Sequence, residues 1–275
     1  MSVSGPAIEA VGLGRDYGTT RALDSLDLLV ARGALVGLLG PNGAGKTTTM
    51  LLLATLLRPS RGTARVFGHD LVADRSAIRR CLGLVFQEPW LERTRLVERA
   101  SQLGRQLSGG LRRLADIARA TVHRPALLIL DEPTVGLDPE HRDRMWTLLD
   151  DERRARGTTI VFSTHYLTEA EACDYVVLLA RGALVADGNP AALKATVGSD
   201  VAEIEGPDAA RLLESARGAG AVRTVVRTER GYRIGMSGPR EPLTALAAAL
   251  PGVSRFAVRP PTLEDVYFER TGRDV

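Results

Sequence analysis

The sequence is poor in cysteine and aromatic residues. Its 275 residues include two cysteines, two tryptophans, five tyrosines and five phenylalanines. Cys81 and Cys173 lie far apart and form no paired motif, so we expect two reduced core thiols rather than a disulfide. Because aromatic residues make up only 4% of the chain and hydrophobic residues 44%, the core must consist mainly of leucine, valine and alanine.

Segments that would cross or enter a membrane are also missing. No apolar run approaches the ~20 residues that a membrane-spanning helix needs. The first residues, Met-Ser-Val-Ser-Gly-Pro, lack the charged-then-apolar order of a signal peptide. We therefore expect a protein of the cytoplasmic type, and we find no long repeat or low-complexity tract in it.

Lysine is scarce as well, since only Lys46 and Lys194 stand among the 36 lysine and arginine residues. The net charge of +3 permits contact with nucleic acid or an anionic membrane surface. The arginines are scattered and rarely lie beside aromatic residues, so we favour a genome biased toward arginine codons and expect no nucleic-acid partner. A lysine at position 46 suits a site that needs a compact ammonium group rather than a planar guanidinium.

The most informative stretch, called the phosphate loop below, fits the pattern G-x-x-x-x-G-K-[ST] and consists of Gly40, Pro41, Asn42, Gly43, Ala44, Gly45, Lys46 and Thr47. Apolar runs at 34–39 and 48–57 predict a buried strand before it and a buried helix after it. Glycines let successive N–H groups turn toward phosphate oxygens, and the helix start adds further donors. Lys46 then reaches the β- and γ-phosphates, and the Thr47 hydroxyl can ligate Mg²⁺.

Polar residues follow three further predicted strands. The strands expected at 82–86, 126–130 and 159–163 are followed by Gln87, by Asp131 with Glu132, and by Thr164 with His165. Open α/β sheets bind ligands at the carboxyl ends of their strands. There Asp131 can hold Mg²⁺, Glu132 can orient or deprotonate an attacking water, and His165 can contact a γ-phosphate. A purely structural pair of carboxylates directly after a buried strand would be costly without a cation or hydrogen bonds nearby.

Two other stretches are candidate nucleotide contacts. In Leu107-Ser-Gly-Gly-Leu111, two glycines precede a periodic apolar run, which predicts a helix N-terminus that can bind an anion. Tyr17 lies upstream of the phosphate loop in Arg15-Asp16-Tyr17-Gly18. Its ring can stack on a nucleotide base or pack on a sheet, and the sequence alone leaves both alternatives open.

The pattern changes in the last third of the chain. A hairpin around Arg181-Gly182 and a short helix opened by Asn189-Pro190 precede a predicted boundary, giving domains at 1–198 and 199–275. Beyond it we expect strands at 201–205, 221–227, 231–236 and 253–258, helices at 208–217 and 241–250, and a tail helix at 263–270. The order βαββαβ is typical of a small ferredoxin-like α+β unit. This unit carries no catalytic constellation.

Together these motifs make residues 7–197 resemble the ATP-binding subunits of ABC transporters. GPNGAGKTT resembles their Walker A motif, LLILDEP their Walker B motif and LSGGL their signature loop. The resemblance implies an α/β P-loop NTPase of ABC type, with a mostly parallel core sheet flanked by helices and an N-terminal antiparallel β subdomain. It implies ATP contacts at Tyr17, the phosphate loop, Thr48, Ser108, Gly109, Gly110 and Asp138. It also implies Mg²⁺ ligands at Thr47, Gln87 and Asp131 and catalytic roles for Gln87, Glu132 and His165.

The resemblance extends to partners. The C-terminal stretch PTLEDVYFERTG is similar to the extension of daunorubicin-resistance drug exporter ATPases. The family's mechanism implies a head-to-tail homodimer, or a heterodimer with a second ATPase subunit, in which ATP lies between the Walker A motif of one chain and residues 108–110 of the other. It also implies a separate membrane permease, placement at the cytoplasmic face of the membrane, and export of a drug or other hydrophobic compound.

One interval departs from the family pattern. Only 19 residues, 88–106, separate Gln87 from Leu107, where the family holds a longer helical subdomain. We hypothesise that the nucleotide site survives while coupling to a permease is weakened, which would make the chain a nucleotide-gated interaction subunit. Intact Glu132 and His165 favour a working ATPase. A soluble ABC ATPase acting on nucleic acid or ribosomes is a further alternative, although such proteins usually carry tandem cassettes or long coiled-coil insertions.

Overall fold

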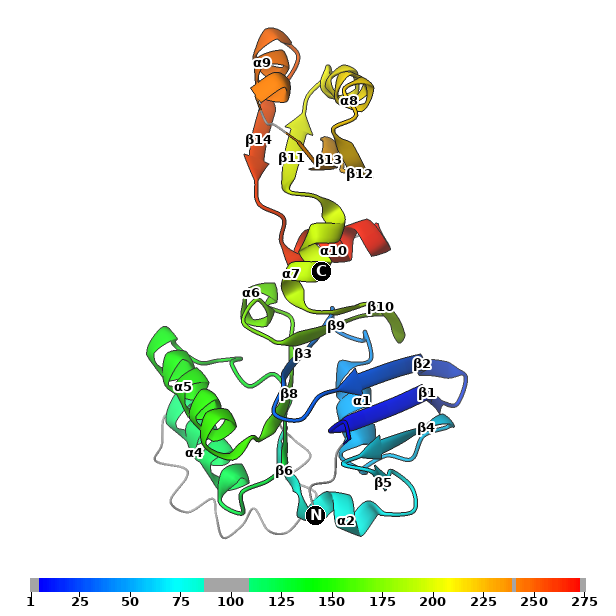
Figure 1. Cartoon of the computed structure of the whole chain (residues 1–275), viewed down its shortest axis with the longest axis vertical. Helices are drawn as coiled ribbons and strands as arrows, with labels where there is room; N and C mark the ends of the chain where they lie inside the picture. Colours follow the sequence, from blue (N-terminus) through cyan, green and yellow to red (C-terminus); the bar gives the residue numbers. More distant parts are fainter. Residues whose placement is uncertain (1–4, 87–108, 239–240, 273–275) are drawn as a thin grey trace. The chain divides into compact units, whose positions relative to one another are not determined.

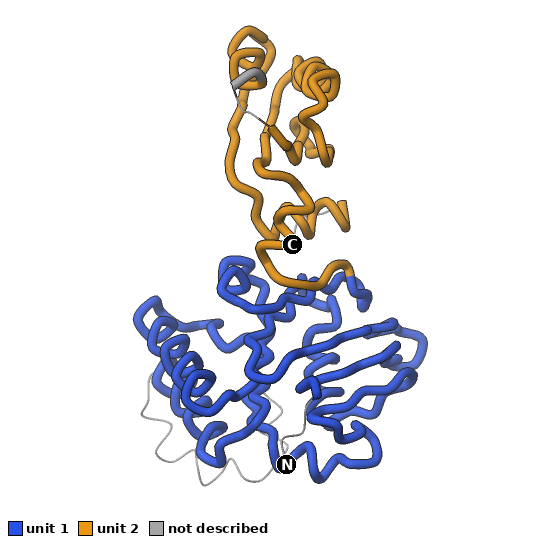
Figure 2. Tube along the Cα trace, viewed as in Figure 1, with its two compact units in different colours: residues 1–184 blue, residues 185–275 orange. Residues whose placement is uncertain are grey.

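The computed structural model describes residues 5–86, 109–238 and 241–272. Gln87, Ser108 and the short interval 88–106 lie outside the described residues, so the predictions made for them stay predictions. The chain forms two compact units, residues 1–184 and 185–275 (Figure 2). The domain boundary expected after residue 198 also stays a prediction, because these units describe packing rather than independent folding. Among the described helices, none has the length and apolar character to span a bilayer.

Two β-sheets form the frame of the first unit (Figure 1). The antiparallel sheet has the order β2-β1-β4-β5 and consists of β1 (Ile8–Tyr17), β2 (Thr20–Val30), β4 (Arg61–Val66) and β5 (His69–Asp70). The larger sheet has the order β10-β9-β3-β8-β7-β6 and consists of β3 (Leu35–Leu39), β6 (Leu82–Val85), β7 (Leu127–Leu130), β8 (Thr159–Thr164), β9 (Tyr175–Ala180) and β10 (Ala183–Gly188). This confirms the predicted parallel core sheet and N-terminal antiparallel sheet.

Parallel pairing brings the predicted polar residues that follow β7 and β8 to one edge of the larger sheet. Leu39 pairs with Thr164, and Leu130 pairs with both Val85 and Phe162. Since parallel strands run in the same direction, the segments that follow β3, β6, β7 and β8 all leave the sheet at its carboxyl edge. The fold therefore gathers chain segments that are more than one hundred residues apart.

Five described helices accompany these sheets, namely α1 (Lys46–Leu53), α2 (Arg75–Arg80), α4 (Gly109–Thr121), α5 (Pro139–Arg156) and α6 (Leu167–Ala170). Helix α1 is buried between side chains of both sheets, as its continuous apolar sequence predicts. It ends at Leu53 rather than near residue 57, because Thr55 takes a left-handed conformation with φ 59°. The Thr55 carbonyl accepts hydrogen bonds from Arg75 and Arg79, which stabilise this turn. Trp146 of α5 and Phe162 of β8 form a T-shaped ring contact, with their ring centroids 5.1 Å apart.

The second unit has the ferredoxin-like arrangement that the sequence predicts. Its antiparallel sheet has the order β12-β13-β11-β14. The strands are β11 (Asp200–Glu205), β12 (Val222–Arg227), β13 (Gly231–Met236) and β14 (Arg255–Arg259), and the helices are α7 (Pro190–Val197), α8 (Ala209–Gly218), α9 (Glu241–Ala249) and α10 (Leu263–Thr271). Apolar residues of α8 and α9 share one core with those of the sheet. The remaining helices, α7 and α10, contact each other.

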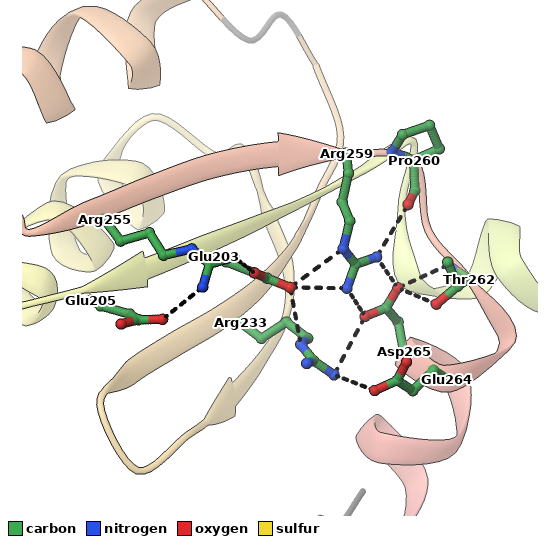
Figure 3. A network of polar contacts seen from close by, with 9 residues as sticks. All are labelled: Glu203, Glu205, Arg233, Arg255, Arg259, Pro260, Thr262, Glu264 and Asp265. Carbon is green, nitrogen blue, oxygen red and sulfur yellow. Dashed lines mark hydrogen bonds and ion pairs between the residues drawn. The ribbon is translucent and has the colours of Figure 1, made fainter. Parts of the chain in front are cut away.

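A network of charged side chains fastens α10 to the sheet of this unit (Figure 3). Arg259 donates to both Asp265 carboxylate oxygens at 2.6 and 2.8 Å, and to Glu203 at 3.1 Å. Asp265 is 2% exposed and also accepts from the Thr262 amide, which caps the helix. Burial raises the pKa of Asp265, but the hydrogen bonds from Arg259 and Thr262 outweigh it, so the pKa lies below its ordinary value. The network is therefore a structural element that favours the ionised carboxylate.

Replacing Asp265 with Asn should lower the unfolding free energy of this unit by about 3 kcal/mol at neutral pH, because Arg259 loses a buried charged partner. A depressed carboxylate pKa stabilises the fold above the unfolded value near 3.9 and loses that effect as pH falls through the folded value. The difference between wild type and variant should therefore shrink below about pH 4. Hydrogen exchange of the β11 and β14 amides measures it, and Glu264→Gln, at a half-exposed position, is the control. Equal effects of both changes would contradict the structural role of Asp265.

Candidate functional site

The phosphate loop follows β3 and leads directly into α1. Gly40, Gly43 and Gly45 have φ values of 146°, 78° and 108°, which favour glycine. A Cβ atom at Gly40 would lie 2.2 Å from the Leu179 carbonyl oxygen, so the close packing of the loop on β9 also requires glycine there. The loop therefore has the local geometry that the motif needs, with the N-terminus of α1 at its end.

Lys46 is the first residue of α1 and is only 5% exposed. Its Nζ donates hydrogen bonds to the carbonyl oxygens of Gly40 at 2.6 Å and Pro41 at 3.2 Å, and lies 4.0 Å from a Glu132 carboxylate oxygen. Burial lowers the pKa of Lys46 below its ordinary value, although the carboxylates of Glu132 and Asp131 favour its charged form. The ammonium group thus stands between the loop and the end of β7.

Asp131 follows β7 and is held by hydroxyl groups from two other elements. Ser163 of β8 donates to Asp131 Oδ1 at 2.5 Å, and the Thr47 hydroxyl of α1 lies 3.2 Å from Oδ2. Adjacent ligands of an octahedral Mg²⁺ ion are about 3.0 Å apart, so the Thr47 and Asp131 oxygens fit two neighbouring positions around such an ion. No group of three or more histidine, cysteine or acidic residues within the described part of the chain could hold a metal, so phosphate and water oxygens would complete the shell.

Glu132 combines a strained backbone with a carboxylate that lies near two nitrogen atoms. Its φ of 44° lies in the left-handed region, which is costly for a residue other than glycine. The Ser163 hydroxyl accepts a hydrogen bond from the Glu132 amide at 2.8 Å. One Glu132 carboxylate oxygen lies 3.7 Å from His165 Nδ1 and 4.0 Å from Lys46 Nζ, distances longer than direct hydrogen bonds. The structure thus brings together Lys46, Glu132 and His165, as the sequence led us to expect.

The residues after Glu132 meet the start of α4. Asp138 caps α5 by accepting from the His141 amide at 2.9 Å, and it also contacts His141 Nδ1 at 2.7 Å. These contacts hold the pKa of Asp138 below its ordinary value, the backbone hydrogen bond most strongly. The His141 ring packs on Gly110, where an added Cβ would lie 2.7 Å from the ring. Gly109 and Gly110 are the first described residues of α4, so the predicted helix is confirmed, while its N-terminus at Ser108 stays a prediction.

The other predicted nucleotide contacts are Tyr17 and further residues of the phosphate loop and α1. Tyr17 ends β1 in the antiparallel sheet, 44% exposed, with the Arg15 guanidinium 4.9 Å from its ring centroid. Along the phosphate loop, Asn42 is exposed and Ala44 is buried, while Thr48 is half-buried in α1. Stacking of a base on Tyr17 therefore stays a prediction.

Sequence reasoning missed two residues that organise the site. Ser163 bonds the Asp131 carboxylate and the Glu132 amide, and Arg113 donates to backbone carbonyls around them. Ser163 could have been found from its position, because it precedes Thr164-His165 at the end of a strand beside β7. Arg113 had no distinguishing signal in a chain with so many arginines.

Comparisons with known proteins identify relatives of this chain. A model of the ABC transporter family matches residues 23–100 and 90–135. The daunorubicin/doxorubicin resistance ATP-binding protein DrrA of Streptomyces peucetius is 36% identical over 97% of this chain and 92% of that protein. Nod factor export ATP-binding protein I of Cupriavidus pinatubonensis is 37% identical over 95% of this chain and 89% of its own length. These matches include most of the C-terminal unit.

Solved structures resemble the chain in fold. An ATP-binding subunit of an ABC transporter is 28% identical with a TM-score of 0.57, covering 68% of this chain and 92% of that one. The protein cbiO1 of Clostridium perfringens, part of the ABC transporter complex cbiONQ, is 25% identical with a TM-score of 0.58, covering 68% and 89%. The chain therefore belongs to the ATP-binding proteins of the ABC transporter family, and it hydrolyses ATP.

The alignment with the Streptomyces protein also bears on chain length. It runs over 308 positions, more than the 275 residues present here, so the relative contains residues that this chain lacks. The two pieces matched by the family model meet between residues 90 and 100, inside the interval that is short in this sequence. Both findings agree with a shortened segment after Gln87.

Replacing Lys46 with Ala should weaken ATP binding at least about 10-fold, because the loop loses its only ammonium group near the phosphates. Titration with a fluorescent ATP analogue measures this change. The matched control is Lys194→Ala, which alters the other lysine, on α7 in the second unit, and should leave affinity unchanged. Equal affinities of wild type and Lys46→Ala would contradict a phosphate role for Lys46.

Proposed function

We propose that this chain is the ATP-hydrolysing subunit of an exporter and powers a separate membrane permease. The observation that carries the proposal is the convergence of Lys46, Glu132 and His165 beside the Thr47–Asp131 pair. The names of similar proteins point to export, since one relative is a drug-resistance protein and another exports Nod factor. The transported compound is then a drug or another hydrophobic molecule.

The phosphate loop binds the triphosphate in this proposal. Amides of the loop and of the α1 N-terminus donate to phosphate oxygens, and Lys46 exchanges loop carbonyls for the β- and γ-phosphates. Thr47 and Asp131 would hold Mg²⁺, with Gln87 as a further ligand. When bound, such an ion neutralises charge that develops on the phosphates during transfer. Ser163 keeps the Asp131 carboxylate pointed toward Thr47.

Glu132 serves as the general base. A water held against its carboxylate attacks the γ-phosphorus, the Glu132 carboxylate takes the proton, and the bond to the β-phosphate oxygen breaks to release ADP and phosphate. Its distances of 3.7 Å to His165 and 4.0 Å to Lys46 place the carboxylate between two donors without a direct bond to either. His165 then contacts the γ-phosphate at the moment when Glu132 acts, and Gln87 completes the catalytic group.

A second chain would complete the site. In the proposed head-to-tail dimer, Ser108, Gly109 and Gly110 of one subunit contact ATP bound by the loop of the other, and Asp138 lies at the interface. The start of α4 at Gly109 supports this arrangement, because a helix N-terminus directs amide donors at an anion. Tyr17 stacks on the base from the antiparallel sheet. The dimer works at the cytoplasmic face of the membrane.

The short interval 88–106 motivates a second candidate. It supports the hypothesis that the chain binds and hydrolyses ATP but transmits dimer closure poorly to a permease. In that case the protein is a nucleotide-gated interaction subunit rather than an efficient pump component. The two candidates share the same site and differ only in coupling.

Replacing Glu132 with Gln should slow ATP turnover at least about 100-fold while ATP binding is retained, because the amide cannot accept the proton from water. Steady-state phosphate release and nucleotide titration together measure the effect. Glu140→Gln, on the exposed side of α5, is the matched control and should turn over like wild type. Turnover of Glu132→Gln within twofold of wild type would remove Glu132 as the base.

Coupling can be measured with this chain and a candidate exporter permease reconstituted together in vesicles. If the short interval weakens coupling, the permease should raise ATP turnover by less than about twofold, while the isolated chain still hydrolyses ATP. The control is loss of turnover with Lys46→Ala, which shows that the measured rate belongs to this site. Efficient drug export by the reconstituted pair would contradict the interaction-subunit candidate and support the exporter.

A further inference from the structure

Arg113, one turn into α4, makes four hydrogen bonds to main-chain carbonyl groups. Its Nη2 donates to the Asp131 oxygen at 2.6 Å and the Glu132 oxygen at 3.1 Å. Its Nη1 donates to the Phe86 oxygen at 3.1 Å and its Nε to the Pro133 oxygen at 3.3 Å. A guanidinium has five N–H donors in a rigid fork, and four carbonyls here are arranged to accept from it. One side chain thus ties together two separate loops.

These carbonyls lie where two paired strands leave the sheet. Phe86 follows β6 and residues 131–133 follow β7, and the register of these two strands ends at Val85 and Leu130. Arg113 donates to these carbonyls from a helix, and it reaches the segments that follow both strands. Burial lowers the pKa of Arg113, opposed by Asp116 and Asp131, and an arginine stays charged in this setting. The bonds are therefore charge-assisted.

The peptide groups of Glu132 are held at both ends. Ser163 accepts from the Glu132 amide, and Arg113 donates to the Glu132 carbonyl. A non-glycine residue with φ of 44° persists only where its surroundings determine the backbone. The direction of the Glu132 carboxylate depends on this backbone, since its carboxylate must lie within reach of both Lys46 and His165.

Helix α4 is also fixed to the segment that follows Glu132. Gly110 packs against the ring of His141, and that ring contacts Asp138. The first two turns of α4 therefore contact this segment at residues 131–133 and again at His141. A displacement of α4 cannot leave the main chain of Glu132 unchanged unless the bonds of Arg113 break.

We propose that Arg113 is a positioning residue for ATP hydrolysis: it links α4 to the main chain of Glu132 and so directs the Glu132 carboxylate toward the reacting water. This rests on the proposed role of Glu132 as the base. Arg113 touches neither nucleotide nor water in this proposal and acts only through Glu132. Nucleotide affinity, which depends on the phosphate loop, is independent of it.

Replacing Arg113 with Met should lower kcat about 10- to 100-fold, because a small misplacement of the base is costly to catalysis. KM and the affinity for a fluorescent ATP analogue should stay within threefold of wild type. Arg113→Lys should recover part of the rate, since an ammonium group can replace at most three of the four bonds. Arg112→Met changes the exposed neighbour on the same helix and should behave like wild type.

A double-mutant cycle with Glu132→Gln separates positioning from general support of the fold. If Arg113 acts through Glu132, Arg113→Met should change the residual turnover of Glu132→Gln by less than twofold. Equal losses in both backgrounds, a loss of affinity that parallels the loss of rate, or an unchanged kcat would each overturn the proposal. If Glu132→Gln itself turns over normally, the proposed function fails instead. If Glu132→Gln is slow and Arg113→Met is fast, only the positioning role fails.

Discussion

The hydrogen bond between Ser163 and Asp131, 2.5 Å long, is the constraint on which the site depends. It joins the ends of β7 and β8, and the same hydroxyl accepts from the Glu132 amide, so one side chain sets both acidic residues. A carboxylate that is 5% exposed needs such partners, because an isolated buried charge is costly. Parallel pairing makes the bond available, since it places residue 163 beside the segment that follows Leu130. The Thr47 hydroxyl of α1 then meets the carboxylate from the other side.

Much of this arrangement follows from local sequence. The parts that do not follow from it depend on contacts between residues far apart in the chain. The phosphate loop needs left-handed glycines next to a strand and a helix, and all three signals lie within twenty residues. The order of strands and helices in the second unit is equally local, and its predicted elements agree with the observed ones to within about two residues. The end of α1 was misplaced because Thr55 is stabilised by arginines 20 and 24 residues away.

The roles of Ser163 and Arg113 also depend on residues that are distant in the sequence. Their roles arise from bonds across 18 to 32 residues, and no local pattern distinguishes Arg113 from the other arginines. Arg113 is half-buried and its four hydrogen bonds go to main-chain carbonyls, which residues of almost any type could supply. Such a residue is recognised only when the strand ends are in place. The polar residues after β7 and β8, in contrast, were predictable because parallel strands share a carboxyl edge.

Two charged groups, one in each unit, differ in the distances between their side chains. In the second unit Arg259 and Asp265 bind each other through two direct hydrogen bonds, so their charges are neutralised within the fold. In the first unit Lys46, Glu132 and His165 are drawn together at 3.7–4.0 Å, too far for direct bonds. Both groups contain buried charges. The spacing of 3.7–4.0 Å leaves Lys46 and His165 able to contact a phosphate and Glu132 able to contact a water, as the proposed function requires. Close pairing makes the second-unit network structural, whereas convergence without direct pairing is what the proposed function requires of Lys46, Glu132 and His165.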